Sequence, residues 1–241
     1  MEIRLNKHLA QAGVASRREV DRMIIEGRIK VNGQVVQALG YKIDDQKDRV
    51  EVDGKRVERK EGMVYLIINK PPGFLVTMKD PLRRPTVQQL LPALKKRVFP
   101  VGRLDYDSEG LLLLTNDGEL AHRLLHPRFK IQKTYLAEVK GIPALTQIAR
   151  LEKGIYLDGK RTAPARFEKL RGGFKKSLFK VEIHEGRKRE VRRMFEVIGH
   201  GVLHLKRIGF GGVRLGSLGS GKWRFLTRKE VDTLKKKAEL I

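Results

Sequence analysis

Three acidic residues stand within five positions of one another, directly ahead of an apolar run. They are Asp105, Asp107 and Glu109, and they are followed by Gly110 and the leucines of 111–114. Carboxylates at this spacing can coordinate a cation, transfer a proton or attack as a nucleophile. The first six positions fit a calcium-binding loop, but its twelfth position is Asn116 rather than a bidentate glutamate, and leucines fill its second half. The pattern therefore disfavours calcium, and we expect no metal site.

The same acids do not favour a sugar-cleaving site. Such a site needs two carboxylates at a set separation, which Asp105 and Asp107 could supply. Aromatic residues, however, make up only 6% of the chain, with one Trp, so nothing else indicates sugar binding. His122 and His126 lie four residues apart without a third metal ligand near them in sequence. Neither a two-carboxylate sugar site nor a histidine-based metal site is therefore favoured, and a single nucleophilic carboxylate is a further possibility.

The composition points to a polyanionic partner. The 241 residues contain 52 Lys and Arg against 28 Asp and Glu, a formal net charge of +24, and 40% of the residues are hydrophobic, enough for a core. Residues 1–60 carry a net +4 and residues 61–241 the remaining +20. A folded protein this basic is expected to bind nucleic acid.

Other features narrow the class of protein. The chain has no cysteine, which excludes disulfides, thiolate nucleophiles and cysteine-based zinc sites. Its charged start is not followed by an apolar segment, and no apolar run approaches the roughly 18 residues of a membrane span. We therefore expect a cytoplasmic location and no membrane partner.

The first sixty residues predict a small domain of two helices and short hairpins. Apolar residues at near-helical spacing run from Ile3 to Gly13, and Ser16 starts a second helix that ends at Gly27. Asn32-Gly33 predicts a hairpin, and a strand over 49–52 turns at Asp53-Gly54. The polar segment 58–62 marks the boundary, so the expected domains are 1–60 and 61–241.

The larger domain predicts an α+β fold. Apolar runs predict strands near 63–68, 111–114, 134–139, 178–183 and 202–207, and helical patterns predict helices ending near 125, over 189–198, and from 227 onward. These elements do not alternate in a regular strand–helix rhythm. The expected central sheet is therefore mostly antiparallel or mixed.

The N-terminal domain carries basic side chains suited to a phosphate backbone. We expect RNA contacts from Arg4, Lys7, Arg17, Arg18, Arg22, Arg28 and Lys30. A DNA-binding helix-turn-helix would need base-reading residues on its second helix, and the segment 17–26 has no Asn or Gln. The runs over 5–18 and 27–33 instead resemble the S4-type RNA-binding module, named for a small-subunit ribosomal protein, across about residues 3–50.

Four blocks of the larger domain resemble the RsuA/RluB-type ribosomal RNA pseudouridine synthases. The blocks are Leu66–Gly73, Gly102–Gly118 with its Gly-Arg-Leu-Asp start, Lys133-Thr134-Tyr135, and Glu185–Phe195. The family often has Thr at the place of Ser108, which keeps the hydroxyl. The residues of the last block, Glu-Gly-Arg-x-Arg-Glu-Val-Arg-Arg, favour the large-subunit members of the family.

This resemblance implies roles for individual residues. Asp105 would be the catalytic nucleophile, Tyr135 would stack on the flipped base, and Arg192 would pair with Asp105, with Arg193 as the alternative. Further RNA contacts are implied at Arg103, Lys133, Arg187 and Arg193. The reaction transfers no electrons or phosphate, so we expect no cofactor.

The implied function is the isomerisation of a uridine in ribosomal RNA to pseudouridine. The expected substrate is 23S rather than 16S ribosomal RNA, either naked or within a pre-ribosomal particle, and the expected enzyme is a monomer. Two other interpretations stay open at the level of sequence: an RNA-binding ribosome-assembly factor without catalysis, and a 16S-directed enzyme of the same family. A DNA-binding regulator is disfavoured.

Overall fold

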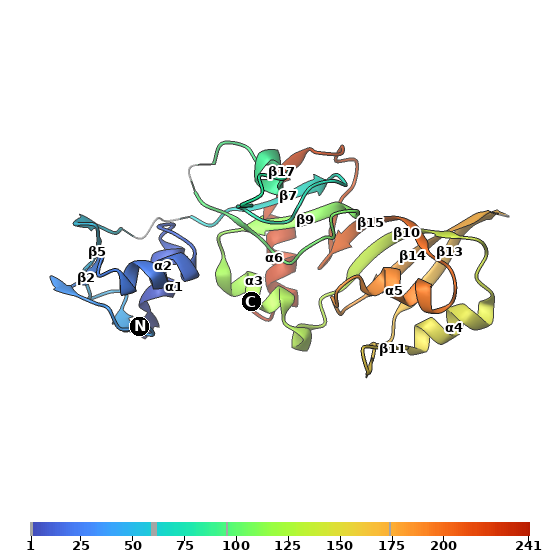
Figure 1. Ribbon diagram of the computed structural model, residues 1–241, viewed down its shortest axis with the longest axis horizontal. Helices are drawn as coiled ribbons and strands as arrows, with labels where there is room; N and C mark the ends of the chain where they lie inside the picture. The colour runs from blue at the N-terminus through green and yellow to red at the C-terminus, as the bar shows by residue number, and fades with distance from the viewer. Residues whose placement is uncertain (1, 59–61, 95, 174) are drawn as a thin grey trace. The chain divides into compact units, whose positions relative to one another are not determined.

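The computed structural model describes residues 2–58, 62–94, 96–173 and 175–241. The chain divides into two compact units, one comprising residues 1–63 with 95–97 and 116–118, and one comprising the remainder. Figure 1 labels the main elements of each unit. The expected boundary at 58–62 falls mostly on residues 59–61, which lie outside the described residues.

The N-terminal unit has the two helices and the hairpin that its sequence predicts. Its elements are β1 (Glu2–Arg4), α1 (Leu5–Gln11), α2 (Arg17–Ile25), β2 (Ile29–Val31), β3 (Gln34–Val35), β4 (Lys42–Asp44), β5 (Val50–Val52) and β6 (Lys55–Arg56). Ser16 caps α2 by accepting a hydrogen bond from the Glu19 amide. Asn32 and Gly33 both have positive φ, as the tight hairpin between β2 and β3 requires. The pairing of β1 with β4 was not predicted.

A mixed sheet forms the centre of the larger unit. Its strand order is β13 (Arg166–Gly173), β14 (Lys176–Ile183), β10 (Lys133–Lys140), β15 (Val202–Phe210), β9 (Glu109–Thr115), β7 (Tyr65–Lys70) and β17 (Trp223–Phe225), with β16 (Val213–Arg214) beside β15 and β8 (Phe99–Pro100) beside β9. Every pairing is antiparallel except that of β15 with β9. The predicted α+β fold with a mostly antiparallel sheet is confirmed.

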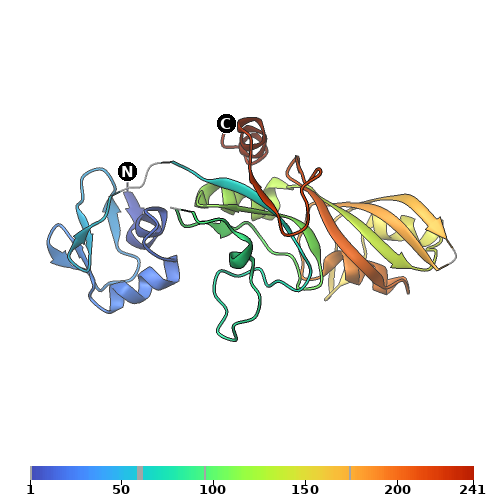
Figure 2. The same ribbon diagram turned by 90° about the horizontal axis from the view of Figure 1, so that it is seen from above.

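Helices cover both faces of this sheet because its central strands are apolar on both sides. The helices are α3 (Gly118–Leu125), α4 (Leu145–Lys153), α5 (Glu190–Val197) and α6 (Arg228–Lys237), and the short elements are η1 (Val87–Leu90), η2 (Pro127–Phe129), β11 (Tyr156–Leu157) and β12 (Lys160–Arg161). Ile67 and Leu113 pack with α3 and α6, whereas Leu66 and Leu112 pack with α4, α5 and η1. Figure 2 shows α6 and η1 on opposite sides of the sheet. None of the helices in the described ranges could span a membrane.

The parallel contact between β15 and β9 depends on Gly110. Its φ of 110° lies in the region that L side chains rarely adopt, and a Cβ there would overlap the backbone of Arg207. The register pairs Gly110 with Arg207, so the two strands meet directly after the acidic segment. Gly110 thus allows β15 to lie beside the turn that carries Asp105.

We predict that Gly110→Ala destabilises the larger unit by about 2–4 kcal/mol, because the added methyl group strains the backbone and separates the two strands. The matched change Gly201→Ala adds its Cβ to open space, ahead of β15, and should leave stability within about 0.5 kcal/mol of the wild type. Urea unfolding of the three proteins measures both effects. Equal stability of the two variants would contradict this account of the strand contact.

Candidate active site

Asp105 lies in a tight turn between β8 and β9. The Ser108 amide donates to the Asp105 carbonyl at 3.1 Å, which closes the turn. The Asp105 side chain is half-buried, and its carboxylate forms no hydrogen bond or ion pair with any residue that the structure describes. A carboxylate without a partner keeps its lone pairs available for a substrate.

Lys70, at the end of β7, holds this turn from beneath. Its side chain is fully buried, and its Nζ donates to the carbonyls of Pro71 (2.9 Å), Tyr106 (3.4 Å) and Ser108 (2.7 Å). Burial lowers the pKa of Lys70 to about 8, although the charges of nearby acids, with Asp107 first, oppose the shift. Lys70 therefore stays protonated at neutral pH. Lys70 belongs to the block Leu66–Gly73, in which the sequence alone indicates no role for the lysine.

The predicted pairing of Arg192 with Asp105 is wrong. Arg192 is 5% exposed, and its Nη2 lies 3.3 Å from the Asp107 carboxylate. It also donates to the Asp107 carbonyl at 3.1 Å and to Ser108 Oγ at 3.4 Å. Because the turn reverses the chain after Asp105, Asp107 is the acid that faces α5. Arg189 reaches the same carboxylate at 3.2 Å.

Arg193 does not pair with Asp105 either. It forms an ion pair with Asp158 at 2.6 Å, because successive helix residues point about 100° apart and Arg193 lies on the other side of α5. Neither Arg192 nor Arg193 lines the cavity beside Asp105. Arg192 acts on the turn and its backbone, not on the Asp105 carboxylate.

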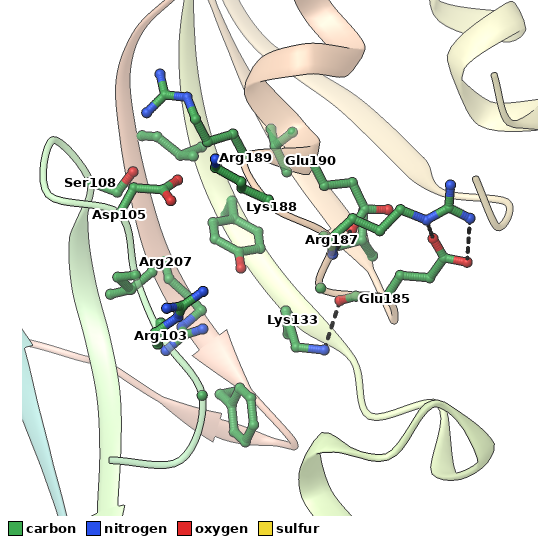
Figure 3. Close-up of a pocket in the computed structure, with 18 of the residues that line it drawn as sticks. Arg103, Asp105, Ser108, Lys133, Glu185, Arg187, Lys188, Arg189, Glu190 and Arg207 are labelled. Atoms are coloured by element: carbon green, nitrogen blue, oxygen red, sulfur yellow. Dashed lines mark hydrogen bonds and ion pairs between the residues drawn. The ribbon is translucent and has the colours of Figure 1, made fainter. Parts of the chain in front are cut away.

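A cavity of about 620 Å³ lies beside Asp105 and contains several of the predicted residues. Its lining includes Arg103, Asp105, Lys133, Tyr135, Arg187 and, from β15, Arg207. Figure 3 shows Asp105 and Ser108 on one side of the pocket and Glu185 with Arg187 on the other. Lys133 and Tyr135 alternate along β10 and so share one face of the sheet.

The charged groups of Lys133 and Arg187 bind other groups of the protein. The Nζ of Lys133 donates to the carbonyls of Glu185 (2.7 Å), His184 (3.3 Å) and Ile131 (3.4 Å). The guanidinium of Arg187 pairs with Glu185 at 2.8 Å and donates to two carbonyls of the β12 strand. These contacts stiffen the pocket wall, so the structure gives both residues a supporting role, and their predicted contact with RNA stays a prediction.

Glu190 is a buried acid behind the same wall. Its Oε2 accepts a hydrogen bond from the Arg187 amide at 3.0 Å. Burial raises the pKa of Glu190, and the nearby Glu185 carboxylate raises it further. Arg103, in contrast, lines the cavity with an exposed side chain.

The predicted basic residues of the N-terminal unit fall into two groups. Arg28 donates to both carboxylate oxygens of Asp53 (2.9 and 2.7 Å) and also pairs with Glu26, and Arg22 pairs with Glu19. The others form no ion pair with any described residue: Arg4, Lys7, Arg17, Arg18 and Lys30. Only this second group presents uncompensated charge.

We predict a specific pH signature for Lys70. Its pKa is about 8 in the folded protein against an ordinary value of 10.5, so between these values the unfolded chain binds more protons than the folded one. The contribution of Lys70 to the free energy of unfolding therefore rises with pH from about 8 to about 10.5. In Lys70→Met this group is absent. The wild-type value minus the variant value, from urea unfolding at each pH, should be flat below pH 8 and then rise; a difference that stays flat would rule out a buried ammonium.

The described residues include no group of three or more His, Asp or Glu side chains placed to hold a metal ion. Residues 64–197 match the family described as RNA pseudouridylate synthase, and residues 3–50 match the S4 domain. A Bacillus subtilis protein named ribosomal large subunit pseudouridine synthase B is 48% identical, with 98% of this chain and 97% of the relative covered. An Aquifex aeolicus protein named as an RNA pseudouridine synthase is 47% identical over 97% and 94%.

A solved structure agrees with these relatives. The crystal structure of a pseudouridylate synthase superposes with a TM-score of 0.70 at 32% identity, and the match covers 96% of this chain and 99% of the other. Asp105, Lys133 and Tyr135 lie within the residues matched by the family model, and the match to the S4 domain covers residues 3–50. The chain therefore belongs to the family of RNA pseudouridylate synthases, isomerases that convert uridine in RNA to pseudouridine.

Proposed function

We propose that this protein converts a uridine of large-subunit ribosomal RNA to pseudouridine, with Asp105 as the nucleophile. The observation that carries the proposal is the Asp105 carboxylate, which has no partner among the described residues and borders a cavity that Tyr135 also lines. The names of the relatives support the large subunit as the target.

The reaction requires a group that can bond to the sugar and later leave it. The C1′–N1 bond of uridine breaks, the base turns, and C1′ bonds to C5, which loses its proton while N1 gains one. No atom is added overall. A carboxylate oxygen of Asp105 can hold C1′ while the base turns, because it is nucleophilic and also a competent leaving group.

The target base must leave its stack before this chemistry can begin. A cavity of about 620 Å³ is large enough for a whole nucleotide, and it opens beside Asp105. We place the uracil against the Tyr135 ring, since aromatic faces stack on bases in a sequence-tolerant way. Arg103 is exposed at the opening, where the phosphates of the extruded nucleotide remain.

Lys70 and Arg192 support this role without touching the substrate. Lys70 binds three carbonyls below the turn, and Arg192 binds Asp107 and Ser108 on the α5 side. The turn is held from two sides, which keeps the Asp105 carboxylate in place for attack. The predictions of a monomer, a cytoplasmic location and a pre-ribosomal particle as substrate stay predictions.

We predict that Asp105→Asn lowers the single-turnover rate by at least about 10⁴-fold, because the amide is a far weaker nucleophile of the same shape. The affinity for RNA should change by less than about threefold. The rate is measured as release of tritium from RNA labelled at C5 of uridine, on 23S and 16S fragments in parallel.

Asp107→Asn is the comparison for this experiment. Asp107 pairs with Arg189 and Arg192 but does not line the cavity. Its loss should therefore loosen the turn and lower activity much less than the loss of Asp105. Retained activity in Asp105→Asn would refute the nucleophile assignment, and lack of tritium release from the wild-type protein on either fragment would favour an RNA-binding assembly factor. Exclusive activity on 16S fragments would refute the large-subunit target.

The N-terminal unit generates a separate prediction. Arg18 carries an uncompensated charge, so Arg18→Ala should reduce the slope of log Kd against log salt by about 1. Arg28 is already neutralised by Asp53 and Glu26, so Arg28→Ala should change the slope by much less and should lower thermal stability instead. Filter binding at several salt concentrations, together with thermal melts, separates the two. Equal slopes for both variants would contradict the division into two groups.

A further inference from the structure

Four basic side chains are buried among the described residues of the larger unit, and Arg207 is the one with neither an ion pair nor a second hydrogen bond. Lys70, Lys133 and Arg192 each bind at least two carbonyl oxygens. Arg207 is 2% exposed, and within the described residues its one hydrogen bond runs from Nε to the Leu111 carbonyl at 2.7 Å. Its Nη2 is buried without a partner, and it forms no ion pair within the described ranges. A buried cationic donor left unpaired is costly, so a binding role would account for it.

Arg207 lies in the wall of the pocket, beside Tyr135. Arg207 on β15 is the register partner of Tyr135 on β10, so the two side chains stand beside each other on one face of the sheet. The Arg207 guanidinium also lies 5.2 Å from the centre of the Phe210 ring. All three residues line the cavity that holds Asp105. The unpaired donor therefore lies at the floor of the pocket, next to the ring on which the base is placed.

Arg207 forms no ion pair with an acid that the structure describes. A second cation lies near it: burial, and then the charge of Arg207, lower the pKa of Lys133 to about 8. The acids near Lys133 are Glu190 and Glu185, which belong to the opposite wall. The floor is thus electropositive and suited to an oxygen that carries negative charge.

The base and the phosphates of a flipped nucleotide lie at different depths in the pocket. A flipped nucleotide enters base first, and its phosphates stay with the RNA strand at the opening. Both arginines line the cavity, but the Arg103 side chain is exposed, whereas Arg207 is buried. We propose that Arg207 binds a carbonyl oxygen of the target uracil, O2 or O4, and stabilises the negative charge that the base acquires when it leaves the sugar. This proposal rests on the proposed function.

The charge arises from the bond that breaks. When an Asp105 oxygen bonds to C1′, the electron pair of the C1′–N1 bond stays with the base, which becomes a uracil anion with charge shared by N1, O2 and O4. C5 then attacks C1′ and displaces the carboxylate, C5 loses its proton and N1 takes one up. A fixed guanidinium beside O2 or O4 favours the anion over neutral uridine, and arginine stays protonated throughout.

The experiment compares Arg207→Gln and wild type on two RNAs that differ only at the target, which carries uridine or 5-fluorouridine. Fluorine withdraws electrons and makes uracil a better leaving group, so it partly replaces the missing cation. We expect the variant to slow single-turnover consumption of uridine by about 10²–10³-fold. The factor by which it slows consumption of 5-fluorouridine should be at least tenfold smaller. Consumption is followed by mass spectrometry of the digested nucleosides.

A purely structural role of Arg207 gives a different result. If Arg207 only anchors the Leu111 carbonyl, Arg207→Gln slows both substrates equally, and that outcome overturns the proposal. Added guanidinium should restore uridine turnover in Arg207→Gly at least tenfold, and lack of rescue in a folded variant counts against the proposal. Thermal melts confirm folding.

Two controls separate this proposal from the proposed function. Lys206→Gln removes one positive charge at the adjacent position, on the opposite face of β15 and outside the cavity lining, and should retain near-wild-type rates. Asp105→Asn tests the proposed function directly. An inactive Asp105→Asn together with a fully active Arg207→Gln would overturn the role of Arg207 alone.

Discussion

The active-site turn of this enzyme depends on one buried ammonium group. Lys70 sits at the end of β7 with no exposed surface and donates to three carbonyls, two of them in the 105–108 turn. The backbone carbonyls of a tight turn cannot all find an N–H donor within the turn, and here the lysine donates to them. Burial of the charge is costly, as its lowered pKa indicates, but the same burial ties the turn to the centre of the sheet.

The contacts that hold the turn leave the Asp105 carboxylate, the proposed nucleophile, without an ion pair among the described residues, because each nearby cation binds another group. Lys70 binds the backbone, while Arg189 and Arg192 bind Asp107. An ion pair directly to Asp105 would draw electron density from its carboxylate and occupy its lone pairs. The arrangement therefore separates the acid that anchors the turn from the acid that is available to the substrate. Arg207 likewise forms no ion pair among the described residues, which leaves its cation available for the base in the proposed role.

The regular elements were largely predictable, and the missed ones share a physical cause. The strands over 63–68, 111–114 and 178–183 and the helix over 189–198 appear as β7, β9, β14 and α5, because strong apolar patterns marked them. β1 with β4, and β17, are short edge strands stabilised by pairing with distant segments. β13 is mostly exposed, so it lacks an apolar pattern. The capping box at Thr227 is present at the start of α6.

The sequence by itself determined the chemistry: a carboxylate at Asp105, an aromatic residue at Tyr135 and a basic RNA-binding module, each within a local motif. Only the tertiary structure decided how these motifs interact. The direction of the 105–108 turn placed Asp107, not Asp105, against Arg192. The pairing of β15 with β9 and β10 carried Arg207 to the pocket floor. Such contacts join residues tens of positions apart through turn geometry and strand register, which local patterns do not encode.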